Sequence, residues 1–147
     1  MFIGRKPVYL VKPTTFMNLS GDAVRNFIDY HKLEDFSKIL VVLDDINLSF
    51  GTVRLRAEAG GQKGLKSIID KLNTTKIPRL RVGIGSNFYN ATSHVLTPFS
   101  ITEKRELPQI INWAADAAES FVKYGIEKTM NRFNRNIFSV NNKEELS

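Results

Sequence analysis

The feature that most constrains the fold of this chain is a run of apolar residues that ends in two acids. Residues 38–45 read KILVVLDD, so the run closes on Asp44 and Asp45. A strand with one buried face alternates apolar and polar residues, whereas a continuous apolar run is typical of a strand buried on both faces. The run therefore predicts a parallel or mixed sheet with helices on both sides.

The rest of the chain supplies strands and helices in alternation. Strands are expected at residues 7–12, 52–57 and 79–85, and helices at residues 21–31, 65–72, 102–122 and 126–133. Because no linker or repeat interrupts this order, the sequence predicts a single α/β domain with a mixed, mostly parallel sheet flanked by helices. We expect this domain to span residues 1–140, and residues 141–147 to form a flexible tail.

The chain is basic, with a formal net charge of +6 and a pI of about 9.7 over 147 residues. Such an excess favours a polyanionic partner through contacts with phosphates, although it also serves solubility alone. The basic residues fall among the predicted strands and helix starts, which favours a binding face. They form three groups: Arg54, Arg56, Lys63 and Lys66; Arg79 and Arg81; and Lys123, Lys128, Arg132 and Arg135. We interpret Lys123, Lys128 and Arg132 of the last group as solvating the final helix.

Composition also excludes several kinds of site. There is no cysteine, which excludes disulfides, thiolate metal sites and cysteine nucleophiles. His31 and His94 are the only histidines and no acids flank them at ligand spacing, so we expect no zinc site and no cofactor. No apolar run approaches the ~20 residues that cross a bilayer, so a membrane protein is not expected. A cytoplasmic location fits these features.

Two polar positions lie where α/β proteins commonly place their ligands. Asn18 follows a predicted strand in the loop FMN, and its amide could orient a water molecule and stabilise an oxyanion. The alternative is a local turn contact. Asp44 and Asp45 are adjacent on a strand and must point in opposite directions. One is expected to face a cleft and the other to satisfy the backbone of the turn, which is also the simplest role for either.

The loop AGGQKG, residues 59–64, comes directly before a predicted helix. Its glycines allow a close approach of backbone, and the helix start offers free N–H groups to an anion. Its spacing is not that of a Walker loop. His31 lies at helical spacing with Val24, Phe27 and Ile28, which indicates a packing residue, and His94 opens the strand-and-turn segment HVLTPFS.

Six segments, in order, carry a resemblance to a known family. They are KPTTFMNLSG (12–21), VVLDDINLSFG (41–51), AGGQKGLKSI (59–68), RLRVGIG (79–85), HVLTPFS (94–100) and MNRFN (130–134). In this order and spacing they resemble peptidyl-tRNA hydrolase of the bacterial type. The resemblance covers nearly the whole chain and implies an α/β fold with a mixed sheet.

The resemblance also implies an activity and a set of site residues. The implied reaction is hydrolysis of the ester that joins a peptide to the 3′ ribose of tRNA, with no metal. Asp44 matches the aspartate that supports the family's histidine base, and Asn18 matches an asparagine that positions water and substrate. Phe16 matches the aromatic residue that lines the site for the tRNA terminus. Lys63 and Lys66 are expected to contact tRNA phosphates.

This chain also departs from the family pattern. The family begins with a strand, a GNPG-like loop and the base histidine, all upstream of the segments found here, and Gln62 and Lys63 replace its His-Asn pair. The alternative to an active hydrolase is therefore a catalytically impaired tRNA- or RNA-binding relative. A nucleotide-binding module without an RNA role would need a phosphate fingerprint, which the sequence lacks. We expect the sheet to lack the family's first strand, and its uncovered edge to promote self-association.

Overall fold

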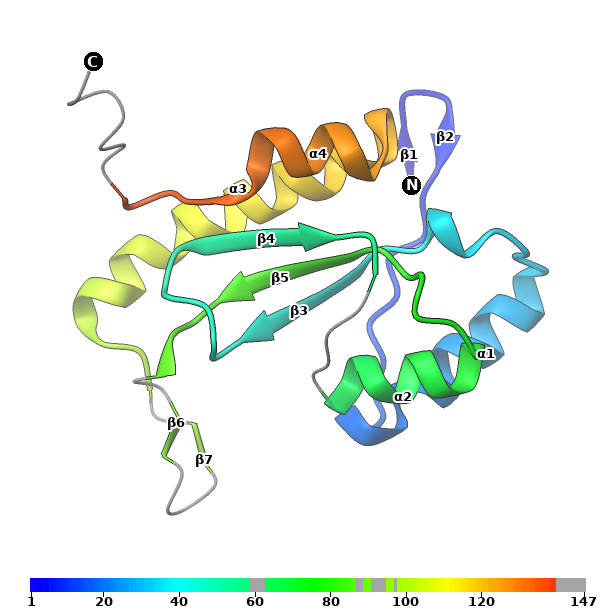
Figure 1. Cartoon of the computed structure of the whole chain (residues 1–147), viewed down its shortest axis with the longest axis horizontal. Coiled ribbons are helices and arrows are strands. Elements are labelled where there is room, and N and C mark those ends of the chain that lie inside the picture. Colours follow the sequence, from blue (N-terminus) through cyan, green and yellow to red (C-terminus); the bar gives the residue numbers. More distant parts are fainter. Residues whose placement is uncertain (59–62, 87–88, 91–94, 97, 140–147) are drawn as a thin grey trace.

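A computed structural model describes residues 1–58, 63–86, 89–90, 95–96 and 98–139. Its centre is a four-stranded sheet in the order β3-β5-β4-β8 (Figure 1). The strands are β3 (Val41–Asp45), β4 (Thr52–Arg56), β5 (Arg79–Gly83) and β8 (Arg135–Asn136). β5 runs parallel to β3 and antiparallel to β4, and β8 is antiparallel to β4. The α/β class and the mixed sheet are confirmed.

Parallel pairing is less frequent in this sheet than expected. Of the described pairings in the central sheet, only β3 with β5 is parallel. The cause is the short connection between β3 and β4, residues 46–51, which can only return the chain in the opposite direction. A parallel connection needs a crossover of about a dozen residues or more, and residues 46–51 are too few for one.

One pair of helices covers a face of the sheet, and a second pair lies beside the β3 edge (Figure 1). Helices α3 (Ile101–Tyr124) and α4 (Ile126–Phe133) pack on one face, where Leu55 and Leu80 form a core with Phe133. Helices α1 (Ser20–His31) and α2 (Lys63–Leu72) pack against each other around Ile28 and Ile68, and this second core reaches the sheet at Val41 of β3. All four helices lie within a few residues of the predicted ranges. None of the described helices is long and apolar enough to cross a membrane.

Shorter elements complete the chain. A hairpin of β1 (Phe2–Ile3) and β2 (Lys6–Pro7) turns at Gly4, whose φ of 60° suits glycine. The others are η1 (Met17–Leu19), η2 (Phe36–Lys38), β6 (Tyr89–Asn90) and β7 (Val95–Leu96). Helix α3 begins at a capping box, in which Ser100 accepts from the Glu103 N–H and the Glu103 side chain accepts from the Ser100 N–H.

The structure corrects two expectations about strands. Residues 7–12 do not form a strand beyond Pro7, because no described strand lies beside residues 8–14 to supply ladder hydrogen bonds. β3 is not buried on both faces, since Val42 is 56% exposed. Helices α3 and α4 pack over β4 and β5, which leaves β3 as an edge with one described neighbour.

The motif MNRFN closes the sheet through Asn134. Its Oδ1 accepts from the Leu55 N–H at 2.5 Å and its Nδ2 donates to the Leu55 carbonyl at 3.0 Å. The side chain thus continues the ladder that β8 forms with β4. It satisfies two backbone groups of a residue that is wholly buried.

We therefore expect Asn134→Ala to lower the free energy of unfolding by about 2–3 kcal/mol, because two backbone groups lose their partners. Urea titration of this variant and of Asn131→Ala, an exposed position on α4, measures the difference. Equal unfolding midpoints for the two variants would show that the Asn134 side chain does not hold β4.

Candidate nucleic-acid interface

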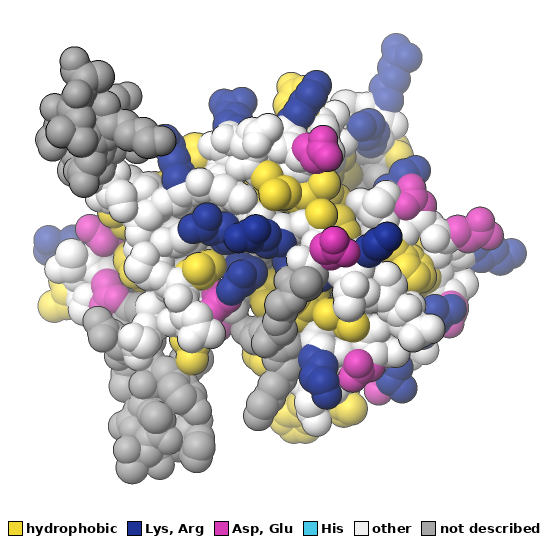
Figure 2. Space-filling model, in the orientation of Figure 1, with side chains coloured by type: hydrophobic (Ala, Val, Ile, Leu, Met, Phe, Trp, Pro, Cys, Tyr) yellow, Lys and Arg dark blue, Asp and Glu magenta, His cyan; other side chains and the backbone are white. Residues whose placement is uncertain are grey.

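Four arginines share one face of the central sheet. In the antiparallel ladder of β4 and β5, Arg54 lies opposite Arg81 and Arg56 opposite Arg79. Directly opposite residues project to the same face. This face is opposite to α3 and α4, because the alternate residues Val53, Leu55 and Leu80 point into their core. Figure 2 shows Lys and Arg side chains gathered at the centre of the molecule on this side.

The arginines differ in their partners. Arg79 is wholly buried and donates to the carbonyls of Ile77 at 3.0 Å and Thr75 at 2.8 Å. Burial lowers the pKa of its guanidinium, and the charge of Arg81 lowers it further. In the described part of the chain, Arg54 and Arg56 form no ion pair.

This arrangement is unfavourable for the free protein. Like charges directly opposite each other destabilise a sheet. Asp45 offsets part of the repulsion through an ion pair with Arg81 at 2.5 Å. The cations of Arg54 and Arg56 are left for an anion from outside, and a phosphate matches the geometry of guanidinium donors. We call Arg54, Arg56 and Arg81 the arginine face.

The structure distinguishes the two adjacent acids. Asp45 is buried, and its Oδ1 accepts from the Asn47 N–H at 2.8 Å while Oδ2 binds Arg81. Asp45 is therefore the residue that satisfies the turn. Asp44 is exposed and projects to the opposite side of β3, as expected for its neighbour on a strand.

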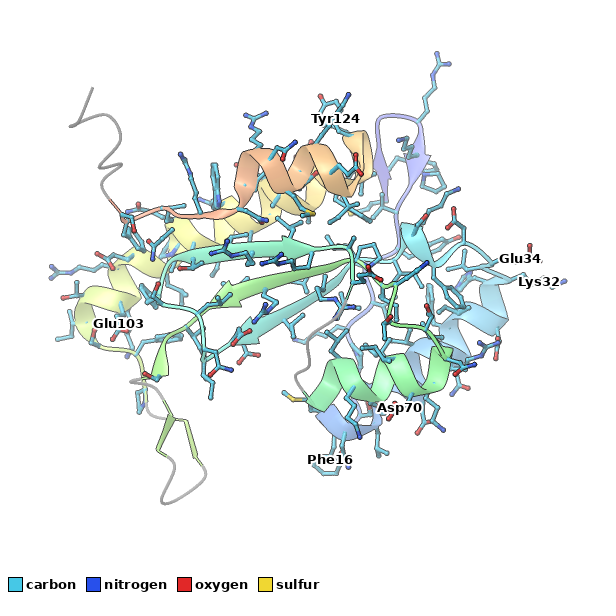
Figure 3. The ribbon with its side chains drawn as sticks, viewed as in Figure 1. Phe16, Lys32, Glu34, Asp70, Glu103 and Tyr124 are labelled. Atoms are coloured by element: carbon cyan, nitrogen blue, oxygen red, sulfur yellow. The ribbon has the colours of Figure 1, made fainter. Side chains whose placement is uncertain are left out.

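The loop that carries Phe16 and Asn18 lies on the side of α2. Its last residues form η1, which leads directly into α1 and packs against α2. Phe16 is 82% exposed and projects away from the sheet below α2 (Figure 3). Asn18 is exposed too, and within the described residues its amide makes no hydrogen bond. Both side chains are accessible to a ligand.

The predicted site residues do not all meet. Phe16 and Asn18 lie beside α2, which also carries Lys66. The Lys66 side chain is 76% exposed, and its Nζ lies 3.9 Å from Oδ2 of Asp70. Lys63 opens α2, but its side chain lies outside the described residues, as does the loop 59–62 with Gln62. Asp44 lies on the face of β3 that is turned away from the arginine face, and no described hydrogen bond joins it to Asn18.

Comparisons with known proteins decide the family. The model of the peptidyl-tRNA hydrolase family matches residues 1–143. The chain belongs to this family.

Its relatives named peptidyl-tRNA hydrolase are similar in sequence and fold. The chain is 44% identical over 135 residues to one from Clostridium perfringens, with 90% of this chain and 71% of the relative covered. It is 47% identical over 134 residues to one from Syntrophomonas wolfei, with 90% and 73% covered. A crystal structure of a peptidyl-tRNA hydrolase with N-propanol has a TM-score of 0.74 at 27% identity and covers 86% of this chain.

The chain spans less than two thirds of the solved structures that it matches. It covers 66% of the N-propanol complex. For the enzyme from Acinetobacter baumannii, the TM-score is 0.72 at 27% identity, and the match covers 84% of this chain and 64% of the enzyme. Membership of the peptidyl-tRNA hydrolase family also excludes the alternative hypothesis that the chain is a nucleotide-binding module without an RNA role.

The histidines of this family member take no described part in the site. His31 packs among aromatic rings, with centroid distances of 4.6 Å to Tyr9, 4.3 Å to Phe27 and 5.0 Å to Tyr30. The predicted packing role of His31 is confirmed. His94 lies outside the described residues, and the described residues contain no group of His, Asp and Glu that could hold a metal.

Proposed function

We propose that this chain is a peptidyl-tRNA hydrolase that cleaves the ester between a peptide and the 3′ ribose of tRNA, which recycles tRNA for translation. The observation that carries the proposal is the arginine face in a chain of this family. Its cations are arranged for phosphates, and the accessible Phe16 and Asn18 lie beside α2 on the same side of the sheet. As a translation enzyme it would act in the cytoplasm.

Each site residue has a proposed role. Phe16 stacks on the terminal base of tRNA, since an exposed aromatic ring binds any base through its π-face. Asn18 orients the attacking water and donates to the oxyanion that forms at the ester carbon. Lys63 and Lys66 contact phosphates. Asp44 supports a histidine base, as the resemblance implies. The proposed hydrolysis uses only water and protein side chains and needs no metal.

A second candidate is a tRNA-binding relative with impaired catalysis. The observation in its favour is the position of Asp44, which projects away from the arginine face and from the side of Asn18. Moreover, His31 is the only histidine among the described residues, and it packs against the rings of Tyr9 and Phe27 and is not placed beside Asp44. This candidate keeps the phosphate contacts, and the described part of the chain places no histidine base beside Asp44.

Peptide release from peptidyl-tRNA by the purified chain separates the two candidates. The hydrolase predicts release above the spontaneous rate that disappears in Asp44→Ala and Asn18→Ala. The binding protein predicts salt-sensitive affinity for tRNA with release at the spontaneous rate. Neither release nor affinity would contradict both.

We also propose that the open edge of β3 promotes self-association. Among the described residues, no second strand pairs with β3 on the side away from β5, Val42 on this strand is 56% exposed, and Leu10 is 81% exposed. A strand edge without a partner is a template for another strand, and the first three residues of β3 carry no charge that would oppose pairing. The expected result is an oligomer in sedimentation velocity that shifts to monomer in Val42→Lys.

The matched control is Ile111→Lys on α3, because Ile111 is exposed to the same 56% as Val42 but lies away from the edge. It should leave the oligomer intact. A wild-type chain that stays monomeric over the whole accessible concentration range would contradict the proposal.

A further inference from the structure

Helix α1 begins without a cap of its own. The residue at its N-cap is Leu19, which makes no side-chain hydrogen bond to the helix. The first N–H groups of any helix lack partners within the helix and need acceptors from elsewhere. This start matters for the site, because Asn18 lies in η1 immediately before it.

The missing acceptor comes from α2. The Ser67 hydroxyl accepts from the Gly21 N–H at 2.9 Å. Gly21 is buried against α2 so closely that a Cβ on it would lie 2.2 Å from the Ser67 carbonyl oxygen and 2.6 Å from the carbonyl carbon. Only glycine allows the first turn of α1 to approach α2 in this way.

A second contact joins the same two helices. Lys71 of α2 pairs with Asp22 of α1 at 2.8 Å, and the Asp22 hydrogen bond raises the pKa of Lys71. Both side chains of this pair are about half exposed (53% and 45%), and exposed ion pairs contribute little to geometry or stability. The partly buried hydrogen bond of Ser67 is the contact that fixes the position of the turn.

We infer that Ser67 is a positioning residue for Asn18 and Phe16, and that it acts through the N–H of Gly21. The inference rests on the proposed function, in which these two side chains bind the 3′ end of the substrate. Ser67 does not contact the substrate in this account. It fixes the loop of Phe16 and Asn18 relative to α2, whose exposed Lys66 is proposed to contact phosphate.

The test compares Ser67→Ala with Ser67→Thr, which keeps the hydroxyl, and with Lys71→Ala, which removes the ion pair alone. One probe is adenosine with an N-acetyl aminoacyl group in amide linkage at the 3′ position; the other is deacylated tRNA. Loss of one neutral hydrogen bond predicts about fivefold weaker binding of the adenosine probe by Ser67→Ala. Ser67→Thr should restore it. The affinity for deacylated tRNA should fall by less than the affinity for the adenosine probe, because the arginine face supplies most of the tRNA contacts and deacylated tRNA has no ester for Asn18 to contact.

A second readout needs no ligand. The side-chain amide resonances of Asn18 in the NMR spectrum of the free protein should move in Ser67→Ala, return in Ser67→Thr and stay in place in Lys71→Ala. Unmoved resonances, or a lower melting temperature of Ser67→Ala with unchanged affinity for the adenosine probe, would overturn the inference. Wild-type protein that binds neither probe would instead contradict the proposed function, and the NMR comparison would still decide the role of Ser67.

Discussion

Replacing Asn18 by alanine is expected to slow peptide release from peptidyl-tRNA by about 10²–10³-fold, the usual effect of losing one donor to an oxyanion. The amide of Asn18 is accessible and forms no hydrogen bond among the described residues, so its loss should remove the proposed contact with the substrate without removing a described contact within the fold. The affinity for deacylated tRNA should not change.

Single-turnover assays of Asn18→Ala and of Asn26→Ala measure this effect. Asn26 is also an exposed asparagine, in the second turn of α1, and its replacement controls for the loss of an amide at this end of the molecule. Equal rates for the two variants would refute a role for Asn18 in the reaction.

The second large effect is expected on the arginine face. The double variant Arg54→Gln with Arg56→Gln should weaken binding of tRNA by about 10²-fold or more at low salt, since hydrogen bonds to charged groups contribute about 1.5–3 kcal/mol each. Each lost phosphate contact also lowers the slope of log K against log salt by about one. The double variant should therefore lose about two from that slope.

The same variant is expected to fold at least as stably as the wild type. Arg54 lies directly opposite Arg81 and Arg56 opposite Arg79, so glutamine relieves the repulsion between like charges. Weaker binding together with a higher melting temperature is the pattern of a site kept for a ligand. The matched control is Lys104→Gln with Arg105→Gln on α3, two exposed cations on another element. If the control lowers the salt slope as much, the arginine face has no special role.

Much of the fold could be predicted from periodicity alone. The helices were predictable because their apolar residues recur at helical spacing, as in residues 102–122. The prediction of a strand at residues 7–12 was wrong. Its apolar residues suit a strand, but a strand also needs a neighbour, and no strand lies beside residues 8–12 in the described chain. The prediction that both faces of β3 are buried was also wrong at Val42. Which strands α3 covers depends on their order in the sheet, and that order cannot be read from the apolar run.

The site was predictable in its residues and less so in its geometry. Strand alternation predicted that Asp44 and Asp45 point apart, but only the turn geometry assigns the Asn47 contact to Asp45. The arginine face required the register of β4 with β5, a tertiary property that sequence spacing does not contain. Nothing in the sequence marks Ser67, because its partner Gly21 belongs to another helix.

The central claim is that the arginine face binds tRNA while the loop of Asn18 acts on the ester. The most direct test is the single-turnover rate of peptide release as a function of enzyme concentration, for the wild type and both sets of variants. Arg54→Gln with Arg56→Gln should reach the wild-type rate at high enzyme concentration, whereas Asn18→Ala should stay slow at saturation. Wild-type release that never exceeds the spontaneous rate would contradict it.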